Sequence, residues 1–267
     1  MNRTIGIIGC GWLGLPLAKA IVSDGHTVHG TTTSEERLPL LKDEHIHPFL
    51  ITLTPNGPRG PILKFLESLD VLIINVPPRL RGDSTENYVK KMEGLHKAIK
   101  ASQIRKIIFV SSTSVYGDVD GTITEETPPT PSTESGRQLL ASEGIFKNDS
   151  QLRTTIVRFG GLIGPGRHPV TLLSDRKGLS NGGAPINLIH LQDCIGILKS
   201  IVDKSWWNET LNAVYPYHPP KMEYYQNEAR KRHLPTPEYR DSSMKSGKKI
   251  SSSKLILVKK YCFNTPI

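Results

Sequence analysis

The chain is poor in the residues that build disulfide scaffolds, metal clusters and membrane spans. Its three cysteines, Cys10, Cys194 and Cys262, are widely spaced and form no CxxC pair, which argues against a disulfide framework and a zinc cluster. Apolar runs such as Val71–Val76 are far shorter than the roughly 20 residues of a membrane span. Four glycines and Pro16 interrupt the apolar stretch near the amino terminus, which disfavours a signal peptide. We expect a cytoplasmic protein with no metal and no membrane anchor.

Aromatic residues are also scarce, at 6% of 267 residues, whereas the formal net charge is +9. Between Lys221 and Lys260 there are 11 basic and 4 acidic residues, so most of the positive charge lies there. No aromatic stacking platform accompanies these charges, which disfavours nucleic-acid binding. We interpret the segment as a solvated helical face, with attraction of an anionic cofactor or substrate as the alternative. The length suits one large or two small domains.

Short apolar runs of strand length alternate with segments of helical periodicity. Runs that are apolar throughout are typical of parallel strands buried on both faces. Strands are expected at Thr4–Gly9, Thr27–Thr31, Phe49–Leu53, Val71–Val76, Lys106–Ser111, Thr154–Phe159 and near Thr210–Val214. Helices are expected at Leu13–Asp24, Glu35–Lys42, Tyr88–Ser102, Ser135–Lys147 and near Cys194–Lys204, with a small helical cap over the last 50 residues. This order predicts an α/β fold with helices on both sides of a parallel sheet.

A glycine-rich turn connects the first expected strand to the first helix. It has the pattern Gly9-x-Gly11-x-x-Gly14, in which the glycines allow a tight turn, close approach of a pyrophosphate, and close helix packing, in that order. The helix amino terminus would offer N–H groups and partial positive charge to phosphates. We predict dinucleotide binding here, by Gly9, Gly11, Trp12, Leu13 and Gly14. The alternative is a turn that serves packing alone.

The end of the second expected strand lacks the acid that holds the ribose 2′-OH in NAD-preferring folds. Thr31, Thr32 and Thr33 stand there instead, and Arg37 follows closely. Hydroxyls with a nearby guanidinium can accept a 2′-phosphate, so we predict that NADP is preferred over NAD. The alternative places Arg37 in solvent on the next helix.

Four further stretches resemble the extended short-chain dehydrogenase/reductases, the epimerase/dehydratase family. They are Ile107–Gly117, Val157–Arg167, Ile189–Asp193 and Thr210–Val214. The resemblance implies a Rossmann-type doubly wound parallel sheet over residues 1–160, which would bind NAD(P). It implies a small carboxy-terminal substrate-binding lobe over residues 161–267, with a helix and a strand near 190–215 returning to the first domain. At the end of the fourth strand we expect the backbone of Val76 and Pro77 to border the cofactor.

The same resemblance places Ser112, four residues before Tyr116, at the family's catalytic Ser/Thr position. There a hydroxyl would polarise a substrate carbonyl or hydroxyl; the alternative is a hydroxyl that satisfies backbone groups at the strand end. Tyr116 itself is predicted to be structural.

The chain departs from the family at the Tyr-x-x-x-Lys pair, which supplies the acid/base and its cationic partner. Ser135 aligns with the tyrosine and Leu139 with the lysine, and serine has no usable acidity near neutral pH without an activating base. The arginine that holds the diphosphate in sugar-nucleotide epimerases is replaced by Ile186. These departures resemble the atypical, YeeZ-like branch of the family and disfavour a sugar-nucleotide epimerase.

Other polar residues remain candidates for chemistry. Arg137 could reach an anionic substrate or form only a surface pair with Glu134. Arg158 and Arg167 flank a glycine-rich loop, and Arg167 is the stronger candidate for binding a small, anionic substrate. His190 belongs to a motif that resembles one of the family, which usually caps and positions a helix. A catalytic role for His190 is the weaker interpretation.

Two functions fit this pattern. The first is an NADP-dependent oxidoreductase of atypical short-chain type that acts on a small carbonyl or hydroxyl compound, with Ser112 as the polarising group and the proton donor unassigned. The second is a non-catalytic NADP(H)-binding redox sensor or regulatory protein, which the missing Tyr/Lys pair favours. The oligomeric state is left open by the sequence.

Overall fold

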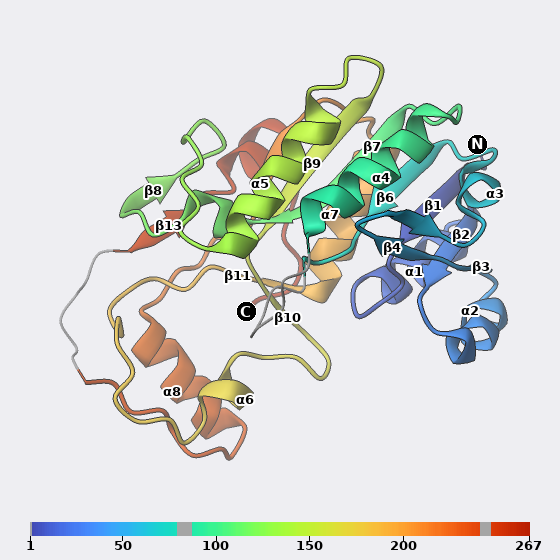
Figure 1. Cartoon of the computed structure of the whole chain (residues 1–267). Helices are drawn as coiled ribbons and strands as arrows, with labels where there is room; N and C mark the ends of the chain where they lie inside the picture. Colours follow the sequence, from blue (N-terminus) through green and yellow to red (C-terminus); the bar gives the residue numbers. More distant parts are fainter. Residues whose placement is uncertain (1, 79–86, 241–246) are drawn as a thin grey trace. The chain divides into compact units, whose positions relative to one another are not determined.

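A seven-stranded sheet forms the centre of the α/β fold in the computed structural model, which describes residues 2–78, 87–240 and 247–267 (Figure 1). Its strands are β1 (Thr4–Ile8), β2 (Thr27–Thr32), β3 (His47–Leu50), β6 (Val71–Ile74), β7 (Lys106–Ser112), β9 (Arg153–Phe159) and β12 (Thr210–Ala213). They lie in the order β12-β9-β7-β6-β1-β2-β3, and the pairings from β3 to β7 are parallel. The strand order reverses at β1, which makes the sheet doubly wound, as the family resemblance implies.

Helices connect these strands, and the apolar periodicity predicts each of them except the short helix at Ile62–Leu66. They are α1 (Gly14–Ser23), α2 (Leu38–Asp43) after a 3₁₀ turn at Glu35–Arg37, α3 (Ile62–Leu66), α4 (Tyr88–Lys100), α5 (Glu134–Lys147) and α7 (Leu191–Asp203). The Asn87 side chain caps α4 by accepting from the Lys90 N–H, and the Thr133 side chain caps α5 by accepting from the Gly136 N–H. These caps satisfy N–H groups that a helix cannot pair internally, so they mark where α4 and α5 begin.

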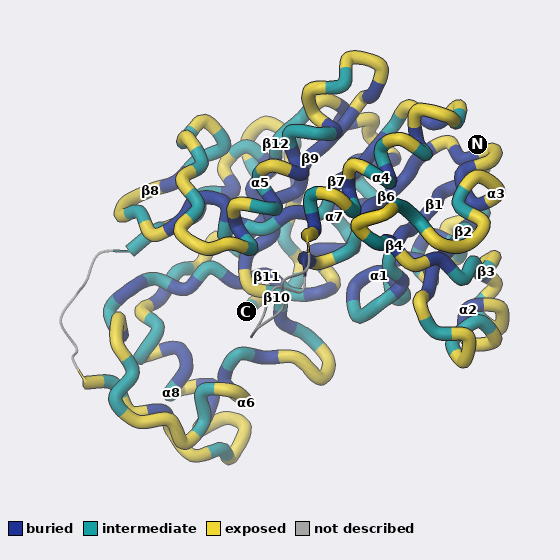
Figure 2. The backbone as a smooth tube through the Cα atoms, viewed as in Figure 1, coloured by how far each residue is buried: buried dark blue, intermediate teal, exposed yellow. Residues whose placement is uncertain are grey.

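The central strands are buried on both faces, which explains their uninterrupted apolar runs. All four residues of β6 are buried, and Figure 2 shows the same dark blue burial along β1 and β6. The strand expected at Phe49–Leu53 was wrong in extent. Pairing with β2 ends at Leu50, and the chain then forms a hairpin of β4 (Thr52–Thr54) and β5 (Gly57–Arg59), because a tight turn with Gly57 at a φ of 112° reverses it.

The chain divides into two compact units. The first consists of Met1–Val115, Pro131–Arg158 and Ile195–Thr210, and the second of Tyr116–Thr130, Phe159–Cys194 and Leu211–Ile267. The predicted division at residue 160, with a helix and a strand near 190–215 returning to the first domain, differs from this partition in the segment 116–130. That segment belongs to the second unit because it contains β8 (Gly121–Ile123), which pairs in parallel with β13 (Lys248–Ile250).

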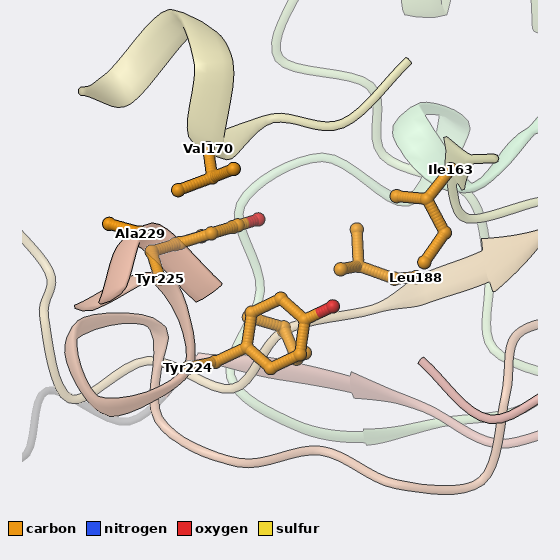
Figure 3. Packing of buried hydrophobic residues seen from close by; sticks show 7 residues of the cluster. Ile163, Val170, Leu188, Tyr224, Tyr225 and Ala229 are labelled. Atoms are coloured by element: carbon orange, nitrogen blue, oxygen red, sulfur yellow. The ribbon is translucent and has the colours of Figure 1, made fainter. Parts of the chain in front are cut away.

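The second unit has its own apolar core. Strands β10 (Gly161–Ile163) and β11 (Leu188–His190) pair in parallel, accompanied by α6 (Val170–Leu173) and α8 (Lys221–Lys231). Their buried cluster is drawn in Figure 3 and consists of Ile163, Val170, Ile186, Leu188, Tyr224, Tyr225 and Ala229. Large aromatic side chains supply much apolar area in a small core.

The helical cap expected over the last 50 residues is confirmed at α8 but does not extend over the whole segment. After α8 the described residues contain one π-helical turn (Lys254–Val258) and the strand β13. Pro235 and Pro237 follow α8, and proline cannot continue a helix. The basic segment 221–260 is therefore not a single helical face.

In the described part of the chain, no helix is both long and apolar enough to cross a membrane. Nor does that part bring together three or more His, Cys, Asp or Glu side chains that could hold a metal ion.

A histidine lies buried beside the core of the second unit. The Nδ1 of His168 accepts a hydrogen bond from the Val170 N–H (3.2 Å), and its Nε2 lies 3.2 Å from the Tyr224 hydroxyl oxygen. Burial and, to a smaller extent, the Arg232 charge together lower the pKa of His168 to about 4, although the Glu228 carboxylate acts in the opposite direction. The folded protein therefore holds His168 neutral at pH values where the unfolded chain binds a proton.

Stability should fall as the pH drops from about 6.5 towards 4, because His168 binds a proton in the unfolded chain but stays neutral in the folded protein. We expect His168→Gln to remove up to about 3 kcal/mol of this pH dependence. The measurement is the melting temperature of both proteins between pH 4 and 7.5. The exposed His45, changed to Asn, is the control and should keep the wild-type profile. Parallel profiles for wild type and His168→Gln would contradict the assignment.

Candidate functional site: a braced glycine turn

The glycine turn lies between β1 and α1, and each glycine has a distinct environment. Gly9 has a φ of 99°, and a Cβ there would collide with the Asn75 carbonyl oxygen. A Cβ on Gly14 would collide with the Gly9 carbonyl oxygen, so α1 packs directly against the turn. A Cβ on Gly11 would meet nothing within 4 Å. The first and third glycines are thus required by the fold, whereas the second faces open space of the kind that a pyrophosphate needs.

Three side chains hold the backbone of this turn. The Thr31 hydroxyl oxygen accepts from the Gly9 N–H (3.0 Å), and the Asn75 side-chain amide donates to the Gly9 carbonyl (3.1 Å). The Arg37 guanidinium donates to the Cys10 carbonyl (3.0 Å). These bonds come from the ends of β2 and β6 and from the 3₁₀ turn after β2. The turn is therefore rigidly shaped before any ligand binds, which reduces the entropic cost of binding.

The amino terminus of α1 follows this turn directly. The residue before the helix is Leu13, which is buried and has no side-chain oxygen to cap the helix. A helix that begins this way presents N–H groups and partial positive charge to an anion. Trp12, between Gly11 and Leu13, is half-buried. The turn and the helix together fit the phosphates of a dinucleotide.

The other predicted cofactor residues have different environments. Thr32 is buried, and its hydroxyl oxygen accepts from the Ser34 N–H (3.2 Å), whereas Thr33 is exposed. The Val76 carbonyl accepts from the Tyr88 hydroxyl (2.8 Å), and Pro77 is exposed. Thr33 and Pro77 are thus the more accessible of these four residues.

Arg37 does not occupy the solvated position that the sequence left open as its alternative. It is half-buried and lies across the glycine turn. The Cys10 thiol beneath it is buried, and burial raises its pKa to about 12 although Thr31 and Arg37 act in the opposite direction. A thiol this weakly acidic is not a nucleophile near neutral pH.

The side chain of Asn75 was missed by the sequence reasoning, which assigned a role only to the backbone there. A polar residue directly after the wholly apolar strand β6 was the available signal. Because β1 and β6 are neighbours in the sheet, the end of β6 lies beside Gly9, and an amide there can reach its carbonyl.

Ser112 ends β7, and its hydroxyl oxygen accepts a hydrogen bond from the Ser114 N–H (3.1 Å). This bond matches the strand-end role that the sequence left open, and it leaves the hydroxyl proton of the half-buried Ser112 able to donate. Helix α5 begins close by, since a Cβ on Gly136 would lie 2.9 Å from the Ser114 carbonyl oxygen. On α5, Ser135 is half-buried and Leu139 is buried.

The three arginines singled out from the sequence have different surroundings. Arg137 forms an exposed pair with Glu134, with Nε and Oε2 2.9 Å apart. Arg167 is exposed, and its backbone exchanges hydrogen bonds with Gly164. Arg158 was wrongly considered for substrate binding, because it is buried in an ion pair with Glu143.

Three predicted motif residues in the second unit are held by hydrogen bonds. The His190 Nδ1 accepts from the Gln192 N–H (3.2 Å), which fits a helix-start role. Tyr116 is buried and donates to the Asn212 side chain (2.8 Å), as expected of a structural residue. Asp193 is buried and anchors the carboxy-terminal segment, which the sequence did not reveal; its carboxylate accepts from the Tyr261 hydroxyl and from the backbone N–H groups of Asn264 and Thr265.

Known proteins resemble this chain in sequence or in fold. Protein YeeZ of Escherichia coli K12 is 35% identical over 247 residues, which cover 92% of this chain and 89% of YeeZ. The structure of MoeE5 in complex with UDP-glucose and NAD superimposes with a TM-score of 0.80 at 17% identity, covering 99% of this chain and 94% of MoeE5. UDP-glucuronic acid 4-epimerase from Bacillus cereus, solved with NAD, gives a TM-score of 0.79 at 18% identity, covering 98% of this chain and 92% of the epimerase.

A family model also matches most of the chain. The NAD dependent epimerase/dehydratase family matches residues 5–177, which include the glycine turn, the end of β7 and the whole of α5. Together with the extensive identity to YeeZ and the doubly wound sheet, this match assigns the chain to the NAD dependent epimerase/dehydratase family, whose members bind a nicotinamide dinucleotide.

Proposed function

We propose that the chain is an NADP-dependent oxidoreductase of the short-chain type, acting in the cytoplasm on a small carbonyl or hydroxyl compound. The observation that carries the cofactor preference is the position of Arg37. Its guanidinium lies against the glycine turn just after β2, where a 2′-phosphate would be recognised, and no acid stands at the end of that strand to repel the phosphate.

Each proposed site residue of the first unit would have a defined role. Gly9, Gly11 and Gly14 shape the turn for the pyrophosphate, and Arg37 would pair with the 2′-phosphate. A bound nicotinamide supplies or accepts a hydride. The Ser112 hydroxyl would donate a hydrogen bond to the substrate oxygen while accepting from the Ser114 N–H. Because Ser135 and Leu139 replace the acid/base pair, the proton would come from water or from the substrate.

Arg37→Gln should weaken NADPH binding by roughly ten- to a hundredfold, because a charge-assisted contact to phosphate is lost. NADH binding should weaken less, through the lost contact with the Cys10 carbonyl alone. Fluorescence titration of wild type and variant with both cofactors measures this difference. Lys42→Gln, which removes an exposed charge from the nearby α2, should leave both affinities unchanged. Tighter binding of NADH than NADPH to the wild type would refute the preference.

Ser112→Ala should lower turnover by about a hundredfold or more, on the scale of removing a hydrogen-bond donor to a developing oxyanion. The assay follows NADPH oxidation over a panel of aldehydes, ketones and enones. NADPH affinity should be unchanged in the variant. Equal turnover in wild type and variant would remove Ser112 from the mechanism.

One specific observation favours the alternative function, a non-catalytic NADP(H)-binding redox sensor or regulatory protein. Leu139 is buried in α5 and Ser135 has no acidity to offer, so the family's proton-transfer pair has no counterpart at these two positions. Tight NADPH binding without turnover on any substrate would establish this second function. Sugar-nucleotide epimerisation is disfavoured, because Ile186 belongs to the apolar core of the second unit and offers no cation to a diphosphate.

A further inference from the structure

A buried charged network lies next to Ser112 and takes no part in the proposed chemistry. The Ser111 hydroxyl donates to the Oε1 of Glu143 (2.6 Å). The Arg158 guanidinium donates two hydrogen bonds to the same carboxylate, from Nε to Oε1 (3.0 Å) and from Nη2 to Oε2 (2.6 Å). The side chains of Arg158 and Glu143 are only 6% and 4% exposed. Charges are buried this completely only when they are paired and hydrogen-bonded.

The network joins three elements of the first unit. Ser111 belongs to β7, Glu143 to α5 and Arg158 to β9. Two parallel bonds between a guanidinium and a carboxylate fix orientation as well as distance. The pair therefore sets how α5 sits against β9, and the hydrogen bond from the Ser111 hydroxyl to Glu143 extends this constraint to the last residues of β7.

Ser111 and Ser112 are consecutive residues of one strand, so their side chains project to opposite faces. A bond that holds Ser111 on one face thus fixes the peptide that carries Ser112 without using the Ser112 hydroxyl. Glu143 also lies one and two helical turns after Leu139 and Ser135, on the same face of α5. The same contact consequently fixes the helix segment that starts beside Ser114.

We infer that Ser111, Glu143 and Arg158 are positioning residues that hold Ser112 at the end of β7. The inference deepens the proposed function and rests on the role assigned there to Ser112. The network orients the hydroxyl donor through the backbone, and it does so in a site whose tyrosine and lysine have been replaced.

The test uses Ser111→Ala, which removes the link to the strand and leaves the Glu143–Arg158 pair intact. The readout is amide hydrogen exchange at Ser114, whose N–H is bonded to the Ser112 hydroxyl oxygen. We expect about fivefold faster exchange there, corresponding to the loss of one hydrogen bond. Amides of β1 and β2 should exchange at the wild-type rate, and Ser111→Thr, which keeps the hydroxyl, should restore slow exchange at Ser114.

Ser142→Ala is the matched control. Ser142 is a buried serine next to Glu143 in α5. Its hydroxyl donates within that helix, to the Gln138 carbonyl (2.7 Å). This variant should leave exchange at Ser114 unchanged. Wild-type exchange in Ser111→Ala, or equal acceleration in Ser142→Ala, would overturn the inference.

Turnover provides the second readout. With any substrate that the panel yields, Ser111→Ala should lower kcat for NADPH oxidation and leave the KM for NADPH unchanged. Lack of turnover in the wild type would count against the proposed function, whereas the exchange rates at Ser114 would still decide whether the network positions Ser112.

Discussion

Gly11→Ala is expected to weaken the affinity for NADPH by a factor of about a hundred, while its melting temperature stays within about 2 °C of the wild-type value. In the protein itself a Cβ at this position meets nothing within 4 Å, so the fold tolerates alanine. In the complex the methyl group would stand where the pyrophosphate approaches the backbone. Titration with NADPH and thermal unfolding of the same preparation measure both effects.

Gly14→Ala is the matched comparison, because its Cβ would collide with the Gly9 carbonyl oxygen. Overpacking of this kind costs about 1–3 kcal/mol, which should lower the melting temperature by several degrees. The two glycines, three residues apart, thus separate binding from folding. Wild-type affinity in Gly11→Ala would mean that the turn serves packing alone.

The second large effect is expected from Glu143→Gln, which breaks the buried ion pair with Arg158. Leaving one buried charge without its partner costs about 3–5 kcal/mol, so the melting temperature should fall by on the order of 10 °C. Denaturant unfolding of wild type and variant gives the free energy of unfolding directly.

Two controls isolate the buried pair as the cause. Arg137→Gln breaks a pair on the same helix whose side chains are 55% and 58% exposed, and it should cost no more than about 1 kcal/mol. The double variant Glu143→Gln/Arg158→Met removes both charges, and it should be more stable than Glu143→Gln alone. A loss in Glu143→Gln as small as in Arg137→Gln would contradict this account.

Local patterns predicted the central elements well. The strand-length segments placed β1, β2, β6, β7 and β9 to within two residues. The reason is clearest at β6, where all four residues are apolar and buried, as expected of a strand covered on both faces. The carboxy-terminal part was predicted less well. There β13 forms only by pairing with β8, which lies more than a hundred residues earlier, and no local periodicity can indicate a partner so distant.

The arginines illustrate the same limit at the level of side chains. Arg158 and Arg167 look alike in the sequence, since both flank a glycine-rich loop, yet one is buried on Glu143 and the other is exposed. Neither Arg37 nor Asn75 is close to the glycine turn in sequence, and their bonds to its carbonyl groups depend on how β2 and β6 flank β1.

The sequence by itself determined the alternation of strands and helices, the position of the glycine turn, and the loss of the tyrosine and lysine at Ser135 and Leu139. These features depend on residue type and on spacing along the chain. Only the tertiary structure decided which side chains brace the turn and which carboxylate Arg158 pairs with. Such contacts join segments that are distant in sequence, and burial makes them strong by removing water from around the charges.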